Sequence, residues 1–260
     1  MIPYLLEYWP IAPIAIFIAA FASLMGIGGG ILWAPYLILV EKLEPKDAIM
    51  ISFMIQTVGM GSATYSYLKK KMLYWKIAKG MMFPLLIGLA IGAFLSQRVL
   101  HGNYIEGLLG GLTITISLLF GFQTEKYDVI LNEDKKTKAP LWLKSEGTIF
   151  GFISGFLSIG SGDFIIPLLR GKLKIPMSGA IATALFLNFF VAFMGGMVHF
   201  GLSGALKIEL IYILAFASFG VLLGGQLGPI LSQRLDEGRL KELFIFVLLL
   251  IGLHLIYKVL

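Results

Sequence analysis

The sequence has no cysteine, and charged residues make up only 14% of its 260 residues. Without cysteine, the chain cannot form a disulfide, a thiolate metal site, a thioether-linked haem or a cysteine nucleophile. The three histidines, His101, His199 and His254, are too scattered for a metal-ligand motif. The sequence also has no Walker A loop, zinc-protease helix or serine-hydrolase elbow. We therefore expect no catalytic residue, no metal and no cofactor.

Hydrophobic residues, by contrast, make up 58% of the chain, and the mean hydropathy is +0.88. Soluble domains are about one quarter charged, so this composition predicts an all-α polytopic protein of the cell membrane, surrounded by the lipid bilayer. The net charge of +6 lies mainly between apolar segments, where membrane topology explains it better than nucleic-acid binding. Six segments have about the length that a crossing helix needs: 48–68, 78–97, 103–122, 177–199, 208–232 and 242–258.

Two glycine clusters interrupt the apolar sequence. The motif GIGGGILWAP at 26–35 is repeated in altered form as SIGSGDFIIP at 158–167, an offset of 132 residues. Such paired breaks in a membrane protein point to the binding site of a transporter. The flanking segments are too short to cross a bilayer comfortably, so we expect half-helices there: 10–25, 31–40, 147–158 and 163–170.

Further matches keep the same offset, which indicates an internal repeat. They include Ala48 with Ala180, Ile49 with Ile181, Gly88 with Gly220, Gly92 with Gly224 and Leu95 with Leu227. The only long polar stretch lies between the two copies. We therefore expect a first membrane repeat at 1–122, a cytoplasmic linker at 123–146 and a second membrane repeat at 147–260.

Positive charge predicts the orientation of the repeats, because Lys and Arg favour cytoplasmic loops. If each glycine-broken region crosses the membrane once, one side holds twelve of the 21 basic residues. If each is a re-entrant hairpin that enters and leaves on the same side, one side holds sixteen. The second arrangement fits better. It predicts two inverted-topology repeats, each with a glycine-broken re-entrant helical hairpin and three transmembrane helices.

The helix starts after the glycine clusters are candidate substrate-binding elements. A helix start carries unpaired amide N–H groups and partial positive charge, and two starts that face one cavity would bind an anion. Alternatively, the glycines only allow helices to pack closely. The amides in question belong to Gly28, Gly29, Gly30, Gly160, Ser161 and Gly162.

Three polar side chains in apolar surroundings complete the candidate site. Gln56 and Asn188 lie at matching positions and need hydrogen-bond partners, either in a ligand or in a neighbouring helix. Their symmetry favours a ligand. A carboxylate in the membrane is costly and usually functional, so Asp163 would gate the site or couple transport to a proton. It could also simply cap its helix, and it would repel an anion unless it is protonated.

The motif G-x-G-G-G, followed five residues later by Pro35 and repeated once per half, resembles the TauE/SafE family of sulfite and organosulfonate exporters. The resemblance covers essentially the whole chain, is strongest at 26–37 and is altered at 151–169, where Ser161 and Asp163 depart from the first copy. It implies a secondary transporter for small anions that often contain sulfur, and the name of the family favours an exporter. It identifies neither the anion nor the direction of transport.

Other function classes stay open at this point. A membrane-embedded enzyme or assembly factor is one alternative, although the apolar segments hold neither paired acids nor a histidine-rich site. An anion channel is another. The sequence gives neither the coupling ion nor the oligomeric state.

Overall fold

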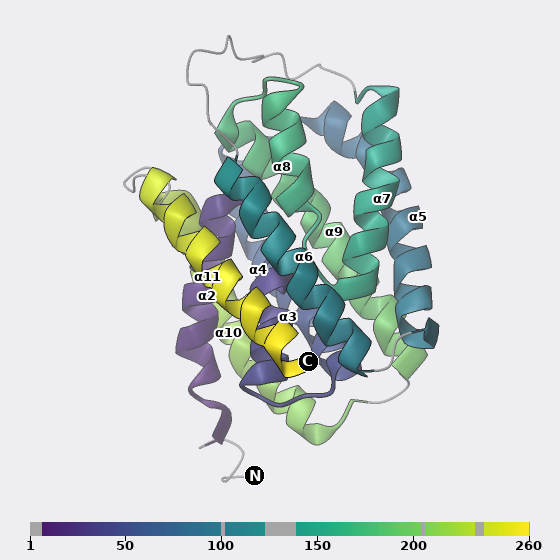
Figure 1. The fold of residues 1–260 in the computed structure, drawn as a ribbon. Coiled ribbons are helices and arrows are strands. Elements are labelled where there is room, and N and C mark those ends of the chain that lie inside the picture. The colour runs from purple at the N-terminus through teal and green to yellow at the C-terminus, as the bar shows by residue number, and fades with distance from the viewer. Residues whose placement is uncertain (1–6, 100–101, 123–138, 204–205, 232–236, 260) are drawn as a thin grey trace.

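The computed structural model describes residues 7–99, 102–122, 139–203, 206–231 and 237–259, which form a bundle of helices (Figure 1). No strand occurs within these ranges, so the predicted all-α class is confirmed. In chain order the helices are α2 (Ile11–Met25), α3 (Gly30–Leu39), α4 (Pro45–Lys69), α5 (Trp75–Val99), α6 (Gly102–Phe122), α7 (Leu141–Leu157), α8 (Gly162–Gly171), α9 (Met177–Ser203), α10 (Ile208–Leu231) and α11 (Glu237–Val259).

Each of the six long predicted spans coincides with one long helix. These helices, α4, α5, α6, α9, α10 and α11, have between 21 and 27 residues. Segments of α5, α9 and α10 are long and apolar enough to cross a membrane. Large apolar side chains lie on the outer surface, such as Phe17 and Phe83, which are 66% and 72% exposed. Such a surface suits contact with lipid rather than water.

Both glycine clusters separate two short helices, in agreement with the sequence. α2 and α3 have 15 and 10 residues, and α7 and α8 have 17 and 10. α2 ends at Gly26 with φ 74°, and α7 ends at Ser158 with φ 59°. Glycine adopts this left-handed conformation freely, whereas another residue loses about 1–2 kcal/mol. Ser158 therefore has to be held in place by its neighbours.

The first short helix of each half rests on a long helix of the other half. α2 packs along α10, and α7 packs along α5. Gly88 and Gly92 of α5 face the backbone of α7, while Gly220 and Gly224 of α10 face the backbone of α2. Small residues at such positions let two helix backbones approach closely. The glycine pairs on the long helices therefore serve packing within the chain.

α4 and α9 pack against each other and carry α3 and α8 respectively. α6 and α11 lie side by side, as the teal and yellow ribbons of Figure 1 show. This arrangement brings both glycine breaks toward the polar side chains of α4 and α9.

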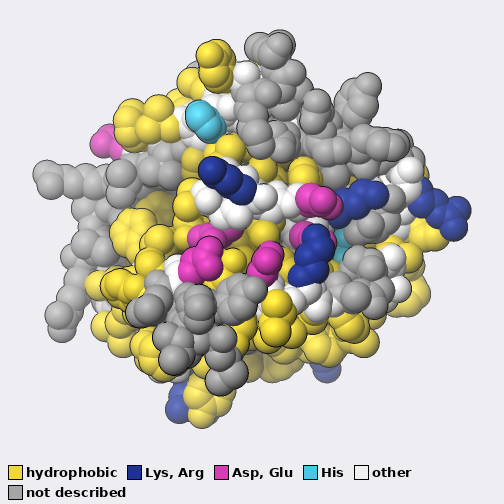
Figure 2. All heavy atoms as spheres, turned by 90° about the horizontal axis from the view of Figure 1, so that it is seen from below, with side chains coloured by type: hydrophobic (Ala, Val, Ile, Leu, Met, Phe, Trp, Pro, Cys, Tyr) yellow, Lys and Arg dark blue, Asp and Glu magenta, His cyan; other side chains and the backbone are white. Residues whose placement is uncertain are grey.

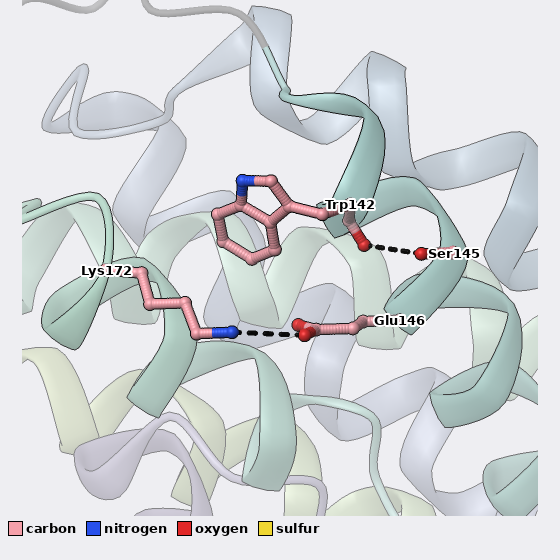
Figure 3. A network of polar contacts seen from close by, with 4 residues as sticks. All are labelled: Trp142, Ser145, Glu146 and Lys172. Carbon is pink, nitrogen blue, oxygen red and sulfur yellow. Dashed lines mark hydrogen bonds and ion pairs between the residues drawn. The ribbon is translucent and has the colours of Figure 1, made fainter.

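α7 begins at Leu141, so its first turns lie within the segment 123–146 that the sequence predicts as a linker. Residues 123–138 of that segment lie outside the described residues. The Nζ of Lys172 lies 3.2 Å from a carboxylate oxygen of Glu146 and 4.6 Å from the centre of the Trp142 ring (Figure 3). These contacts tie the beginning of α7 to the chain just after α8.

The end of the bundle where α4 begins carries acidic and basic side chains, with hydrophobic side chains around them (Figure 2). Lys207, just before α10, donates a hydrogen bond of 2.9 Å to Asp47 in the first turn of α4. This hydrogen bond, together with the negative charge of Asp47, raises the pKa of Lys207 above its ordinary value. The pair joins the first half of the chain to the second.

Candidate functional site

The two glycine breaks cross in direct contact inside the bundle. A Cβ atom placed on Gly28 would collide with the Cα atom of Gly160, and one on Gly160 would collide with the Cα atom of Gly28. Both residues are buried. Glycine is required here because any side chain would push the two backbones apart.

The contacts beside the crossing repeat between the two halves. A Cβ atom on Gly30 would collide with the carbonyl oxygen of Ser158. A Cβ atom on Gly162 would lie 2.7 Å from the carbonyl oxygen of Gly26, which is also too close. Gly30 and Gly162 are separated by 132 residues (162 − 30), as are Gly26 and Ser158 (158 − 26). Corresponding positions of the two halves thus meet corresponding carbonyl groups.

Gln56, on α4, bridges to the second glycine break. Its Nε2 donates to the hydroxyl of Ser158 at 3.0 Å, the carbonyl oxygen of Ser158 at 3.3 Å and the hydroxyl of Ser52 at 3.2 Å. The two serine hydroxyls also lie 3.2 Å apart. This buried cluster holds Ser158 in its left-handed conformation and connects α4 with the end of α7.

Asn188, on α9, serves the start of α8 instead. Its Oδ1 accepts hydrogen bonds from the hydroxyl of Ser161 at 2.6 Å and from the amide of Gly162 at 3.0 Å. Its Nδ2 is buried and has no hydrogen-bond partner. The Oδ1 of Asn188 therefore satisfies donors at the start of α8, while its Nδ2 stays unpaired. A buried unpaired donor is costly unless a ligand accepts its hydrogen bond.

Asp163 lies in the first turn of α8 and is only 3% exposed. Its Oδ1 accepts a hydrogen bond of 3.1 Å from the backbone amide of Gly28, which lies 135 residues away in the other glycine break. Its Oδ2 is buried without a partner. Neither oxygen of Asp163 therefore accepts from an amide of α8, and Asp163 does not cap its own helix, which was one of the two predicted roles.

The starts of α3 and α8 differ in how their amides are used. Within the described residues, no acceptor is bonded to the amides of Gly29, Gly30 or Ile31 at the start of α3. At the start of α8, Asn188 accepts from Gly162. The two helix starts therefore do not offer equal numbers of free donors.

All nine predicted site residues are buried. The structure brings most of them into contact, but Gly29 stands slightly apart, because the nearest atoms to its Cβ position belong to Trp33 and Ala22 of its own half. The role of the nine predicted site residues in substrate binding stays a prediction. Ser158 was not among the predicted site residues, although it begins the second glycine motif. The signal for Ser158 was its position, since it stands where the first copy has Gly26.

No group of three side chains that could hold a metal ion occurs in the part of the chain that the structure describes. His199 is fully buried, and its Nε2 lies 2.9 Å from the carbonyl oxygen of Gly155. It connects α9 with α7.

Two broken helices that meet at a polar centre inside a helical membrane protein are typical of secondary transporters. A family comparison matches residues 11–255 to the family described as "Sulfite exporter TauE/SafE". The chain belongs to this family, as its sequence motif suggested.

Known relatives match over almost their whole length. "Probable membrane transporter protein YunE" of Bacillus subtilis (strain 168) is 26% identical, over 91% of this chain and 92% of the relative. "Probable membrane transporter protein ORF9" of Sinorhizobium sp is 24% identical, over 94% and 90%. "Probable membrane transporter protein MJ0441" of Methanocaldococcus jannaschii is 23% identical, over 90% and 90%. No solved structure matches. The family and the relatives indicate a multi-pass membrane transporter rather than an enzyme.

Proposed function

We propose that this chain is a secondary transporter that exports small anions, with sulfur-containing anions such as sulfite or organosulfonates as its substrates. The substrate binds near the middle of the membrane, where the starts of α3 and α8 converge. Alternating access then exposes this site to one side of the membrane at a time. The substrate is moved without chemical change, so no cofactor takes part.

The crossing of Gly28 and Gly160 is the observation that carries this proposal. Two helices begin directly after the crossing, and a helix start carries partial positive charge and amide donors that suit an oxyanion. Irregular backbone at membrane depth is tolerated where it is covered by protein or lines a cavity. Gln56 and Asn188 add side-chain donors at the same place, and Asp163 gates the site or couples it to a proton.

We also propose that 1–122 and 147–260 are inverted repeats joined by a cytoplasmic linker at 123–146, each repeat with one re-entrant hairpin. Two observations support this arrangement. The contacts of Gly30 and Gly162 correspond at an offset of 132 residues (162 − 30). The helix pairs α2–α10 and α5–α7 also correspond, with the partners exchanged between the halves.

The absence of cysteine allows a direct test of this topology. Lys42 lies between α3 and α4, Lys70 follows α4, and both are exposed. In intact cells, an impermeant thiol reagent should label Lys42→Cys, and it should label Lys70→Cys only after the membrane is opened. Labelling of Lys70→Cys alone from outside would contradict the orientation.

Transport is tested with purified protein in liposomes and a panel of sulfite, thiosulfate, methanesulfonate and chloride. We expect saturable flux of at least one sulfur anion. Gly160→Val should abolish it, because the added side chain separates the crossing. Gly111→Val, on α6, is the matched control, since a Cβ atom there meets nothing within 4 Å. Folded wild-type protein that moves none of these sulfur anions would refute the proposal, and fast, non-saturating flux would indicate a channel.

A further inference from the structure

We propose that, while no substrate is bound, the carboxylate of Asp163 holds the amide of Gly28 at the edge of an anion site formed by the start of α3. A substrate anion takes its place when Asp163 takes up a proton. One proton then accompanies each anion through the membrane. This inference rests on the proposed anion transport, and it assigns Asp163 the role of an internal competitor of the substrate.

The position of Asp163 is the first argument. Its Oδ1 accepts from the amide of Gly28, two residues before the first residue of α3. An oxyanion bound at that helix start would use the same kind of backbone donor. The carboxylate therefore already makes the contact that the substrate is expected to make, and it does so from the opposite half of the chain.

The unequal helix starts are the second argument. The first amides of α3 have no acceptor within the described residues, whereas Asn188 occupies the amide of Gly162 at the start of α8. The start of α3 is thus the better place for an anion. Asp163 is the carboxylate that reaches this side of the crossing.

Two buried atoms without partners give independent support. The Nδ2 of Asn188 and the Oδ2 of Asp163 both lack a hydrogen-bond partner, and the two residues are only 2% and 3% exposed. Buried polar atoms are rarely left unpaired. A bound oxyanion would accept from the Asn188 donor, and a proton on Asp163 would satisfy the remaining carboxylate oxygen.

Electrostatics explains why the anion and the proton move together. Two negative charges close to each other repel strongly in surroundings of low polarity. An anion beside the ionised carboxylate is therefore disfavoured, and a proton that binds to Asp163 from the aqueous side removes the repulsion. The proton leaves on the other side with the anion, after which the carboxylate returns to the amide of Gly28.

Proton uptake by other ionisable groups, on α8 and on the elements packed against it, has to be distinguished from proton uptake by Asp163. The crossing itself carries none between Gly26 and Gly29. The remaining ones are Arg170 in the last turn of α8, Lys144 and Glu146 in the first turns of α7, and His199 on α9. Of these, only His199 is as deeply buried as Asp163. His199→Gln is therefore the necessary control.

The experiment measures methanesulfonate binding to the full-length protein in detergent between pH 5 and pH 8, a range in which this probe stays singly charged. Calorimetry in two buffers of different ionisation heat gives the number of protons bound. We expect uptake of about one proton per anion, and a Kd that rises up to about tenfold per pH unit once Asp163 ionises.

Asp163→Asn keeps the shape of the side chain but not its charge. It should bind methanesulfonate with a Kd that does not change with pH and is at least about tenfold lower than that of the wild type at pH 8. His199→Gln and Asp47→Asn should retain the pH dependence of the wild type. If Asp163→Asn does not fold, the proton counts of the wild type and His199→Gln decide instead: about one in both supports the inference.

Several outcomes would overturn the inference. Binding without proton uptake in the wild type, or unchanged proton uptake in Asp163→Asn, would show that Asp163 is not the competitor, while anion transport would stand. Loss of proton uptake in His199→Gln would assign the proton to the histidine. A wild-type protein that neither binds nor transports any anion of the panel would defeat the proposed function itself, and the inference with it.

Discussion

The starts of α3 and α8 occupy corresponding positions in the two halves, but the protein treats them differently. Asn188 from α9 accepts from the start of α8, whereas the corresponding Gln56 on α4 points to Ser158 in the other half. Asp163 has Ile31 as its counterpart in the first copy (163 − 31 = 132). One half therefore supplies free amide donors, and the other supplies the side chains that control them.

This difference shows how a repeated backbone can acquire a directed function. The crossing of Gly28 and Gly160 needs glycine in both backbone segments, so the two copies are alike there. Beside the crossing, side chains are free to differ. A site between two unlike helix starts can bind a charged substrate at one of them and regulate it from the other.

The strongest test of the symmetric part is Gly28→Val compared with Gly160→Val. Each added side chain collides with the same backbone crossing. Overpacking in a core costs about 1–3 kcal/mol or more, and backbone cannot move aside as a side chain can. We expect both variants to lose flux completely and to unfold at clearly lower temperature, measured in liposomes and by thermal denaturation in detergent. A large effect in only one of the two would contradict the shared crossing.

The helices and the breaks could be predicted from the sequence because they depend on local patterns. The long apolar segments predicted the six long helices, and the glycine clusters predicted the two interruptions. The contacts at the crossing could not be predicted in the same way. The bond between Asp163 and the amide of Gly28 joins residues 135 positions apart, and the choice between capping and bridging depends on how the halves pack.

The site residues show the same limit. The matching positions of Gln56 and Asn188 suggested equivalent roles, but the longer side chain of Gln56 reaches the opposite half, while Asn188 stays with its own. Ser158 stands where the first copy has glycine, and its left-handed conformation becomes understandable only with the hydrogen bonds from Gln56. A pattern of residue types does not contain this information.

The second test compares Asn188→Ala with Gln56→Ala. Removing Asn188 leaves the Ser161 hydroxyl and the Gly162 amide without their acceptor, and each buried unpaired group costs about 1–3 kcal/mol. Removing Gln56 leaves the Ser158 carbonyl unpaired, but the hydroxyls of Ser158 and Ser52 can still bond to each other. We expect the larger loss of stability in Asn188→Ala, measured by denaturation in detergent. A larger loss of stability in Gln56→Ala would show that the hydrogen bonds between Gln56 and Ser158 stabilise the protein more than those of Asn188.

A smaller effect should separate Gly26 and Ser158, the left-handed residues at the ends of α2 and α7. Gly26→Ala introduces the left-handed penalty of about 1–2 kcal/mol, and its Cβ atom would lie 2.8 Å from a side-chain carbon of Ile181. Ser158→Gly removes that penalty but also loses the hydroxyl bonds to Gln56 and Ser52. We therefore expect clear destabilisation in the first variant and a change below about 1 kcal/mol in the second. Equal losses would mean that Ser158 is not strained.

The smallest effect concerns the ion pairs at the two ends of the bundle. Asp47–Lys207 joins the two halves, and Glu146–Lys172 joins the beginning of α7 to the end of α8. The side chain of Lys207 is 61% exposed, so the pair contributes no more than about 1 kcal/mol. The hydrogen bond to Asp47 raises the pKa of Lys207. The contribution of the pair to the free energy of unfolding is therefore fully present below the ordinary lysine pKa of about 10.4. It is lost as the pH rises through the raised value.

The stability difference between the wild type and Lys207→Met should therefore stay constant from pH 7 to pH 9 and vanish only in strong alkali. Denaturation of both proteins across this range, with Asp47→Asn to complete a double-mutant cycle, measures it. A difference that disappears already at neutral pH would mean that the pair does not stabilise the contact between the halves.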